Sequence, residues 1–236
     1  MNLNIFYRIS DAGNPKEKIS GKGKKECLGN ALEIFGKDHF NIRADHCSEE
    51  TLRMIRNFGL EPEISSLGNA GSWLKSARQA LSPEYQNSAL YFIEDDYIHL
   101  PDSTGAILDG LSIADYVSLY DHPDKYTSGI NPLLEDSSEW SRISPGKFCH
   151  WKSSNSTTMT FALKQETLKA DFPVWERHCA AGFPDDFRAF LELQSLDSWE
   201  NRMFGRGRKL ITSLPAFSTH TESAWLSPLR NWSEIS

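Results

Sequence analysis

Long hydrophobic runs are missing from this sequence of 236 residues. No apolar stretch approaches the ~20 residues that a membrane-spanning helix needs, so we predict no transmembrane segment. The first ten residues, MNLNIFYRIS, lack the charged start and the apolar core of a secretory signal peptide. We therefore expect a cytoplasmic protein, and peripheral attachment to a membrane stays open.

Cysteines are few, and the acidic residues outnumber the basic ones. The four cysteines show no CxxC spacing, so we expect reduced thiols rather than a disulfide framework. The formal net charge of -7 argues against a broad surface for nucleic acid or anionic lipid, although it is compatible with a local basic pocket. We predict that nucleic acid is not a partner.

Two common phosphate-binding motifs are absent as well. The first predicted strand, residues 3–9, is followed by a dense turn signal and then by the basic segment KEKISGKGKKE. That segment has neither the GxxxxGK[ST] spacing of a P-loop nor the GxGxxG of a dinucleotide-binding fold. It is either a loop that faces a phosphate or a solvated loop, and the sequence leaves both open.

What the sequence does contain is a regular alternation of strands and helices over its first hundred residues. The predicted strands are 3–9, 40–45, 61–67 and 88–93. The predicted helices between them are 27–35, 48–58 and 73–81. This β-α-β-α-β-α-β order favours a parallel sheet with right-handed crossovers, and therefore an α/β fold.

The second half of the sequence is less regular. Strands are predicted at 116–120, 156–163 and 210–215. Helices are predicted at 165–180, with an interruption at Pro173, and also at 187–194 and 198–206. The change in texture near residue 100 is not linker-like, so we predict one domain with two lobes.

The stretch SALYFIEDDYIHLP, residues 88–101, combines a strand with a cluster of acids. Its apolar β-forming run ends at Glu94, Asp95 and Asp96. Three acids cannot share a dry core without a compensating cation, so they should lie where the strand leaves the sheet. Ligands of open α/β sheets bind at that edge, and crowded oxygen ligands suit Mg²⁺ or Mn²⁺. A solvated acidic turn is the plainer alternative.

The order of these features resembles that of the GT-A glycosyltransferases, from about residue 4 to residue 220. Several weak motifs in the same order carry the resemblance. It implies a three-layer α/β/α sandwich with a mostly parallel central sheet and a Rossmann-like N-terminal half. It also implies a single domain, 1–236, in which about 1–100 binds the nucleotide and about 101–236 binds the acceptor.

The resemblance implies roles for particular residues. It places the divalent ion, Mn²⁺ or Mg²⁺, on Glu94, Asp96 and His220. It places contacts with the donor on Arg8, Asp11, Asp45, Asn69, Ser72 and Asp95. Asp185 and Asp186 precede a predicted helix and are the candidate catalytic base. We favour Asp185 as the base, because Asp186 lies nearer the helix and is the better candidate for its cap.

Together these assignments imply a metal-dependent transfer of a sugar from a UDP- or GDP-sugar to a glycan or another acceptor hydroxyl, with inversion favoured. Two alternatives stay open. One is a sugar-nucleotide pyrophosphorylase, although its Gly-rich N-terminal signature is missing after Ile9. The other is a catalytically inactive module that binds a nucleotide or a glycan. Each acid also has a plainer alternative role as a turn or capping residue.

Overall fold

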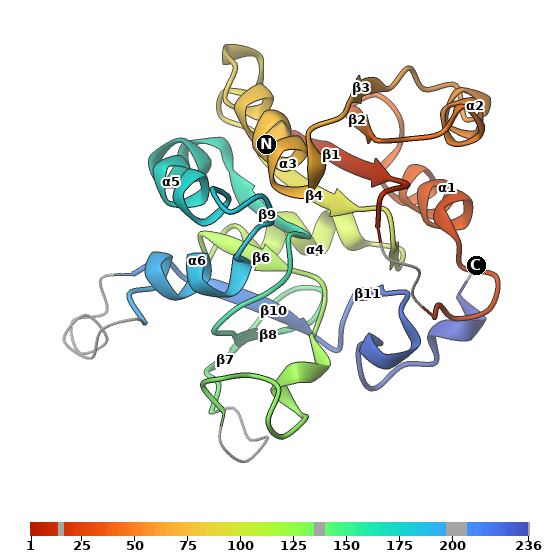
Figure 1. The fold of residues 1–236 in the computed structure, drawn as a ribbon. Helices are drawn as coiled ribbons and strands as arrows, with labels where there is room; N and C mark the ends of the chain where they lie inside the picture. The colour runs from red at the N-terminus through yellow and green to blue at the C-terminus, as the bar shows by residue number, and fades with distance from the viewer. Residues whose placement is uncertain (14–16, 135–139, 197–206, 236) are drawn as a thin grey trace.

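The computed structural model describes residues 1–13, 17–134, 140–196 and 207–235. Within these residues, a nine-stranded sheet forms the middle of three layers (Figure 1). Across the sheet the strands lie in the order β3 (Glu63–Ser65), β2 (Phe40–Asp45), β1 (Leu3–Ser10), β4 (Ala89–Glu94), β9 (Phe161–Lys164), β6 (Tyr116–Ser118), β10 (Leu210–Leu214), β8 (His150–Ser153) and β7 (Ile143–Pro145).

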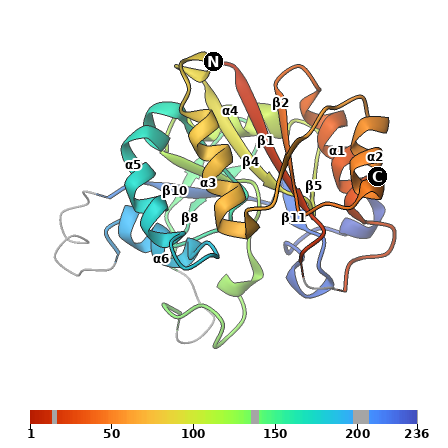
Figure 2. The same ribbon diagram turned by 45° about the horizontal axis from the view of Figure 1, so that its top comes forward.

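Helices cover both faces of the sheet (Figure 2). One face packs against α1 (Lys24–Phe35), α2 (Glu49–Asn57) and α4 (Ser103–Gly110). The other face packs against α3 (Gly68–Ala80), α5 (Gln165–His178) and α6 (Asp186–Leu193). Short 3-10 turns lie at Pro83–Tyr85, Pro123–Lys125, Ser223–Trp225 and Trp232–Glu234.

The residue pattern of the central strands explains the two cores. In β4, Ala89, Tyr91 and Ile93 point to the layer of α1, whereas Leu90 and Phe92 point to the layer of α3. Side chains of a strand alternate between the two faces of a sheet, so a continuous apolar run is what a strand buried on both faces requires. The polar residues that follow such a run therefore mark the point at which the chain leaves the core.

The strand order confirms the predicted fold class. Strands β3, β2, β1 and β4 are parallel to their neighbours, which is the Rossmann-like arrangement expected for the N-terminal half. Strand β9 is antiparallel to both β4 and β6, and it joins the two halves of the sequence in one sheet. Strand β8 is antiparallel to β10 and to β7, and the remaining strands share one direction.

A two-stranded ribbon beside the main sheet was not predicted. It pairs β5 (Tyr97–His99) with β11 (Ser218–His220) in antiparallel orientation. No strand was predicted at 97–99 or at 218–220, because three residues are too few for a periodicity signal. The short strands β7 and β8 were missed for the same reason.

Two predictions about the second half need correction, and a third is not tested. The strand expected at 156–163 begins only at Phe161, because residues 156–160 bend through a hydrogen-bonded turn region. The helix expected to break at Pro173 is a single helix, α5, because Leu168 and Trp175 hold both of its halves against the sheet. The helix predicted at 198–206 lies outside the described residues.

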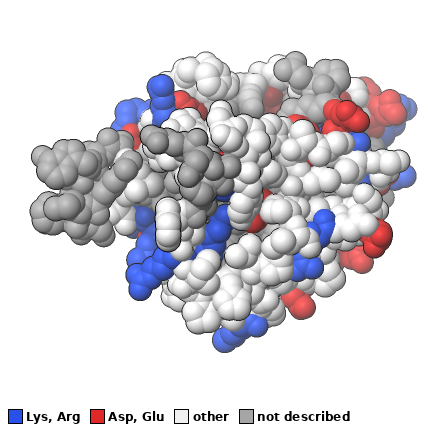
Figure 3. Space-filling view, turned by 90° about the horizontal axis from the view of Figure 1, so that it is seen from below, with Lys and Arg blue, Asp and Glu red and all other residues white. Residues whose placement is uncertain are grey.

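The distribution of basic residues and the length of the helices are relevant to the predictions about nucleic acid and membranes. On the face shown in Figure 3, lysines and arginines lie in small separate groups and form no continuous basic band among the described residues. Among the helices that the structure describes, none is long and apolar enough to cross a membrane.

Candidate active site

A cleft of about 770 Å³ lies at the edge of the sheet where β1 and β4 end. Parallel neighbouring strands deliver the residues after their carboxyl ends to the same edge, which is where ligands of open α/β sheets bind. Its acidic lining residues are Glu94, Asp95, Asp96 and Asp186. Its basic lining residues are Arg8, Lys18, Lys24 and His220.

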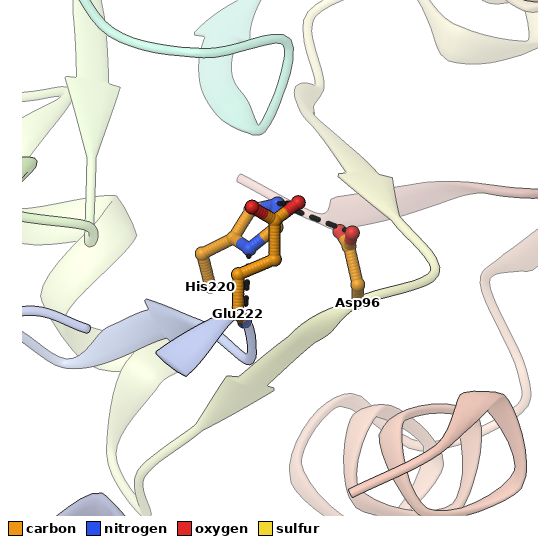
Figure 4. Close-up of side chains that lie close together, drawn as sticks. All are labelled: Asp96, His220 and Glu222. Atoms are coloured by element: carbon orange, nitrogen blue, oxygen red, sulfur yellow. Dashed lines mark hydrogen bonds and ion pairs between the residues drawn. The ribbon is translucent and has the colours of Figure 1, made fainter. Parts of the chain in front are cut away.

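Asp96, His220 and Glu222 form a cluster suited to a metal ion (Figure 4). Asp96 lies in the turn between β4 and β5, His220 ends β11, and Glu222 follows two residues later. One potential ligand atom of each residue lies within 4.8 Å of those of the others. The ribbon holds the three together, because Thr221 N donates to Asp96 O at 2.7 Å.

The donor set of this cluster fits Mn²⁺ or Mg²⁺. One imidazole nitrogen and two carboxylates are ligands that such ions accept, with positions left for phosphate oxygens and water. In the present arrangement, His220 Nδ1 accepts from Glu222 N at 3.2 Å, and Nε2 lies 3.1 Å from Asp96 Oδ2. Nε2 of His220 therefore faces the carboxylate of Asp96. A divalent ion here would be held by Asp96, His220 and Glu222.

Glu94 lies outside this cluster, which argues against its predicted role as a metal ligand. It is the register partner of Arg8 in the β1–β4 pair, and the two side chains form an ion pair. Arg8 also donates to Asn69, to its side-chain oxygen and, at 3.1 Å, to its carbonyl oxygen. The structure thus brings two of the predicted donor-binding residues together at the cleft, with Glu94 as their anionic partner.

Asp45 has a structural role where a ligand contact was predicted. Its side chain is buried, and it accepts from Leu67 N at 2.8 Å and from Gly68 N at 3.0 Å. Burial alone would raise its pKa, but the hydrogen bonds, led by that from Leu67, hold the pKa below its usual value. Gly68 has φ 75°, a conformation that favours glycine. Asp45 therefore fixes the loop that presents Asn69 to the cleft.

Ser72 and Asp11 do not line the cleft, and each supports a residue that does. Ser72 is fully buried and donates to Asn69 O at 3.1 Å, so it supports Asn69 without lining the cleft. Asp11 accepts from Ser48 N at 2.8 Å, at the start of α2, and from Lys24. Burial alone would raise the pKa of Asp11. The hydrogen bonds from Lys24, Ser48 and Thr51 outweigh burial and hold the pKa well below its usual value. Asp11 thus holds Lys24 in place.

Asp95 stays at the cleft as predicted, and its contacts are to the protein. Its Oδ2 accepts from Ser10 N at 3.0 Å and lies 3.9 Å from Lys24 Nζ. Burial, together with the charge of Asp96, raises its pKa to about 6. Asp95 therefore joins the ends of β1 and β4, and its direct contact with a ligand stays a prediction.

The structure reverses the assignment within the acidic pair at α6. Asp185 is the N-cap, with its side chain accepting from Arg188 N at 3.1 Å, and its backbone is not helical, at φ -94° and ψ 73°. Asp186 is the first residue of α6 and lines the cleft. Burial, followed by the charge of Glu94, raises the pKa of Asp186 to about 7. The candidate base of this pair is therefore Asp186.

Two residues at the site were missed in the sequence. Glu222 follows His220 at a spacing of two, which places both side chains on the same side of an extended segment. That spacing was a usable signal. Lys18 belongs to the basic segment for which a phosphate-facing loop was one of two interpretations, and it lines the cleft together with Lys24.

Comparison with known proteins gives remote structural likenesses and no family. No protein-family model matches this sequence, and no curated protein matches it. A mannose-1-phosphate geranyltransferase from Thermus thermophilus has 12% identity and a TM-score of 0.48, over 90% of this chain and 74% of the other. A197 from STIV has 13% identity and a TM-score of 0.49, over 97% and 92%.

A third solved structure is a CMP:2-keto-3-deoxy-manno-octonic acid synthetase complexed with CTP. It has 11% identity and a TM-score of 0.48, over 90% of this chain and 89% of the other. At this distance the likenesses do not decide a function, which has to come from the geometry of the cleft.

Proposed function

We propose that this protein is a metal-dependent glycosyltransferase that moves a sugar from a UDP- or GDP-sugar to an acceptor hydroxyl, with inversion. The observation that carries the proposal is that two different chemical groups line one cleft. One is the cluster of Asp96 and His220, completed by Glu222, and the other is the half-buried carboxyl of Asp186. The cleft volume of about 770 Å³ is within the range of small-molecule sites.

The reaction requires a group that stabilises negative charge on the departing diphosphate, and the metal-type cluster is suited to hold an ion that does so. Breaking the bond between a sugar and a nucleoside diphosphate leaves negative charge on the diphosphate, and a divalent ion held by Asp96, His220 and Glu222 would stabilise that charge. Lys24 and Arg8 line the same cleft. Lys24 forms an ion pair with Asp11, and Arg8 forms one with Glu94. They supply positive potential while the ion pairs keep them in position.

Asp186 answers the second requirement, which is a base for the acceptor hydroxyl. A base works best when its pKa is near the working pH, and burial raises the pKa of Asp186 to about 7. The carboxylate takes the proton of the hydroxyl as the new bond forms at the anomeric carbon. Asp186 belongs to α6, so it acts on the acceptor from an element separate from the metal-type cluster.

The test is a transfer assay with purified protein, Mn²⁺, a panel of UDP- and GDP-sugars and a panel of glycan acceptors, read as release of nucleoside diphosphate. We expect turnover with at least one pair, loss of turnover on chelation of the metal, and a rate about 10²–10⁴-fold lower for Asp186→Asn. Asp185→Asn is the matched control and should keep near-normal turnover. Metal-dependent binding of a nucleotide sugar without any turnover would instead support a binding module.

A sugar-nucleotide pyrophosphorylase is the second candidate. It is favoured by Lys18, in the segment between β1 and α1, and by Lys24, the first residue of α1, which both line the cleft. Lys24 Nζ lies 3.9 Å from Asp95 Oδ2. Such an enzyme would join a sugar 1-phosphate to a nucleoside triphosphate and release pyrophosphate. Incubating the protein with both substrates and Mg²⁺, and measuring pyrophosphate, separates this activity from sugar transfer.

A further inference from the structure

The segment that carries Lys18 is fastened to the segment that carries the metal-type cluster. Ile19 N donates to Thr221 O at 2.9 Å, and Ser223 N donates to Glu17 O at 2.9 Å. These two bonds flank an antiparallel bridge between Lys18 and Glu222. Residues 17–19 therefore extend the β5–β11 ribbon by one short strand-like stretch.

This bridge fixes the direction of the Lys18 side chain. When the flanking residues make the hydrogen bonds, the bridged pair is the close, non-hydrogen-bonded kind, with Cα atoms about 4.5 Å apart. Directly opposed residues of an antiparallel pair place their side chains on the same face. Lys18 thus projects on the face of Glu222, which is consistent with its place in the cleft lining.

The basic side chains of the cleft differ in how they are engaged. Arg8 is held by Glu94 and Asn69, and Lys24 by Asp11 and the carbonyl of Ser10. Lys18 Nζ has no hydrogen bond, and no ion pair within 4.0 Å, to any residue that the structure describes. Its backbone is fixed on the ribbon, and its ammonium group is available to a ligand.

We propose that Lys18 binds a phosphate oxygen of a diphosphate group held at the cluster of Asp96, His220 and Glu222. The inference rests on the proposed function for the presence of a diphosphate, and it adds the residue that recognises the group directly. Because Lys18 and Glu222 are bridge partners, the backbone of Lys18 keeps a fixed relation to the cluster, and its ammonium group stays within reach of an anion held there. An anion that contacts both Lys18 and a metal ion at the cluster is bound more tightly than an anion that contacts only one of them.

The test measures binding of inorganic pyrophosphate in the presence of Mg²⁺ by calorimetry, for the wild type, Lys18→Gln, Lys18→Arg and Lys25→Gln. Pyrophosphate carries no base and no sugar, so only contacts to the phosphates are measured. Lys25 is exposed and does not line the cleft, and Lys25→Gln removes the same charge from the same segment. It is the matched control.

We expect Lys18→Gln to weaken pyrophosphate binding about 10- to 100-fold, which is the range for one hydrogen bond to a charged group. Lys18→Arg should recover most of the affinity, and Lys25→Gln should bind as the wild type does. All variants should melt near the wild-type temperature. Equal affinities for Lys18→Gln and Lys25→Gln, or a wild type that does not bind pyrophosphate with Mg²⁺, would overturn the assignment.

The two proposals can fail separately. If the wild type binds pyrophosphate, Lys18→Gln loses that binding and no sugar is transferred, then Lys18 keeps its role and the transferase proposal is wrong. If the wild type transfers sugar and Lys18→Gln binds pyrophosphate normally, then the transferase proposal stands and the role of Lys18 is wrong.

Discussion

The half-buried carboxyl of Asp186 should make the stability of this protein depend on pH in a direction opposite to that of an acid whose pKa is lowered by folding. Burial raises the pKa of Asp186 from 3.8 to about 7 in the folded state. Between these values the folded state keeps a proton that the unfolded state has released. Stability falls with pH wherever the folded state binds more protons, so Asp186 costs stability progressively as the pH rises from about 4 to about 7.

The size of the effect follows from the same two pKa values. A difference from 3.8 to about 7, at about 1.4 kcal/mol for each pKa unit, gives a cost of about 4 kcal/mol once Asp186 is ionised. Asparagine has a similar shape and no charge at any of these pH values. Asp186→Asn should therefore resemble the wild type at about pH 4 and be more stable by up to about 4 kcal/mol at about pH 8.

Urea unfolding of both proteins at intervals of about one pH unit across this range measures the difference directly. Asp185→Asn is the control, because asparagine is as good an N-cap as aspartate and the N-cap contact does not depend on burial of a charge. Its offset from the wild type should be small and nearly constant over the range. Parallel stability curves for Asp186→Asn and the wild type would refute the reasoning, since they would mean that Asp186 titrates normally in the folded protein.

Three further predictions concern the neighbouring acids. Glu222→Gln should weaken Mn²⁺-dependent binding of UDP or GDP more than Glu94→Gln does, as measured by calorimetry, because Glu94 lies outside the metal-type cluster; the opposite ranking would return Glu94 to the metal site. Asp45→Ala should lower the free energy of unfolding by about 1–3 kcal/mol, as measured with urea, because it leaves buried N–H groups without acceptors; an unchanged midpoint would contradict this. Asp185→Ala should cost about 1 kcal/mol through loss of the α6 N-cap, seen as a lower melting temperature.

The N-terminal half could be predicted from the sequence because its signals are local. The run at residues 89–93 is long and apolar, and the acids that follow it had to lie at the sheet edge. The ribbon of β5 and β11 could not be predicted in the same way, because its two strands are three residues each and lie more than a hundred residues apart. Short strands of this kind form through tertiary contacts, which local patterns do not encode.

At the candidate site, too, some features could be predicted from the sequence and others could not. The acids at 94–96 pointed to metal chemistry and the resemblance added His220, and the structure brings Asp96 and His220 together. The order of Asp185 and Asp186 could not be decided from sequence, since either acid can cap a helix and the choice depends on the backbone angles before α6. The backbone contacts of Asp45 could not be foreseen, because a turn acid that accepts from backbone N–H groups and a ligand-binding acid look alike in a sequence.

The ribbon of β5 and β11 also has a consequence for the growing chain on the ribosome. Asp96 is synthesised more than a hundred residues before His220 and Glu222. Domains generally form from the N-terminus during synthesis, at about 5–20 residues per second, so the parallel half of the sheet can assemble while the metal-type cluster is still incomplete. For that interval the nascent chain holds three neighbouring acids without the histidine that faces them. The metal-type cluster can therefore form only after Glu222 has been synthesised.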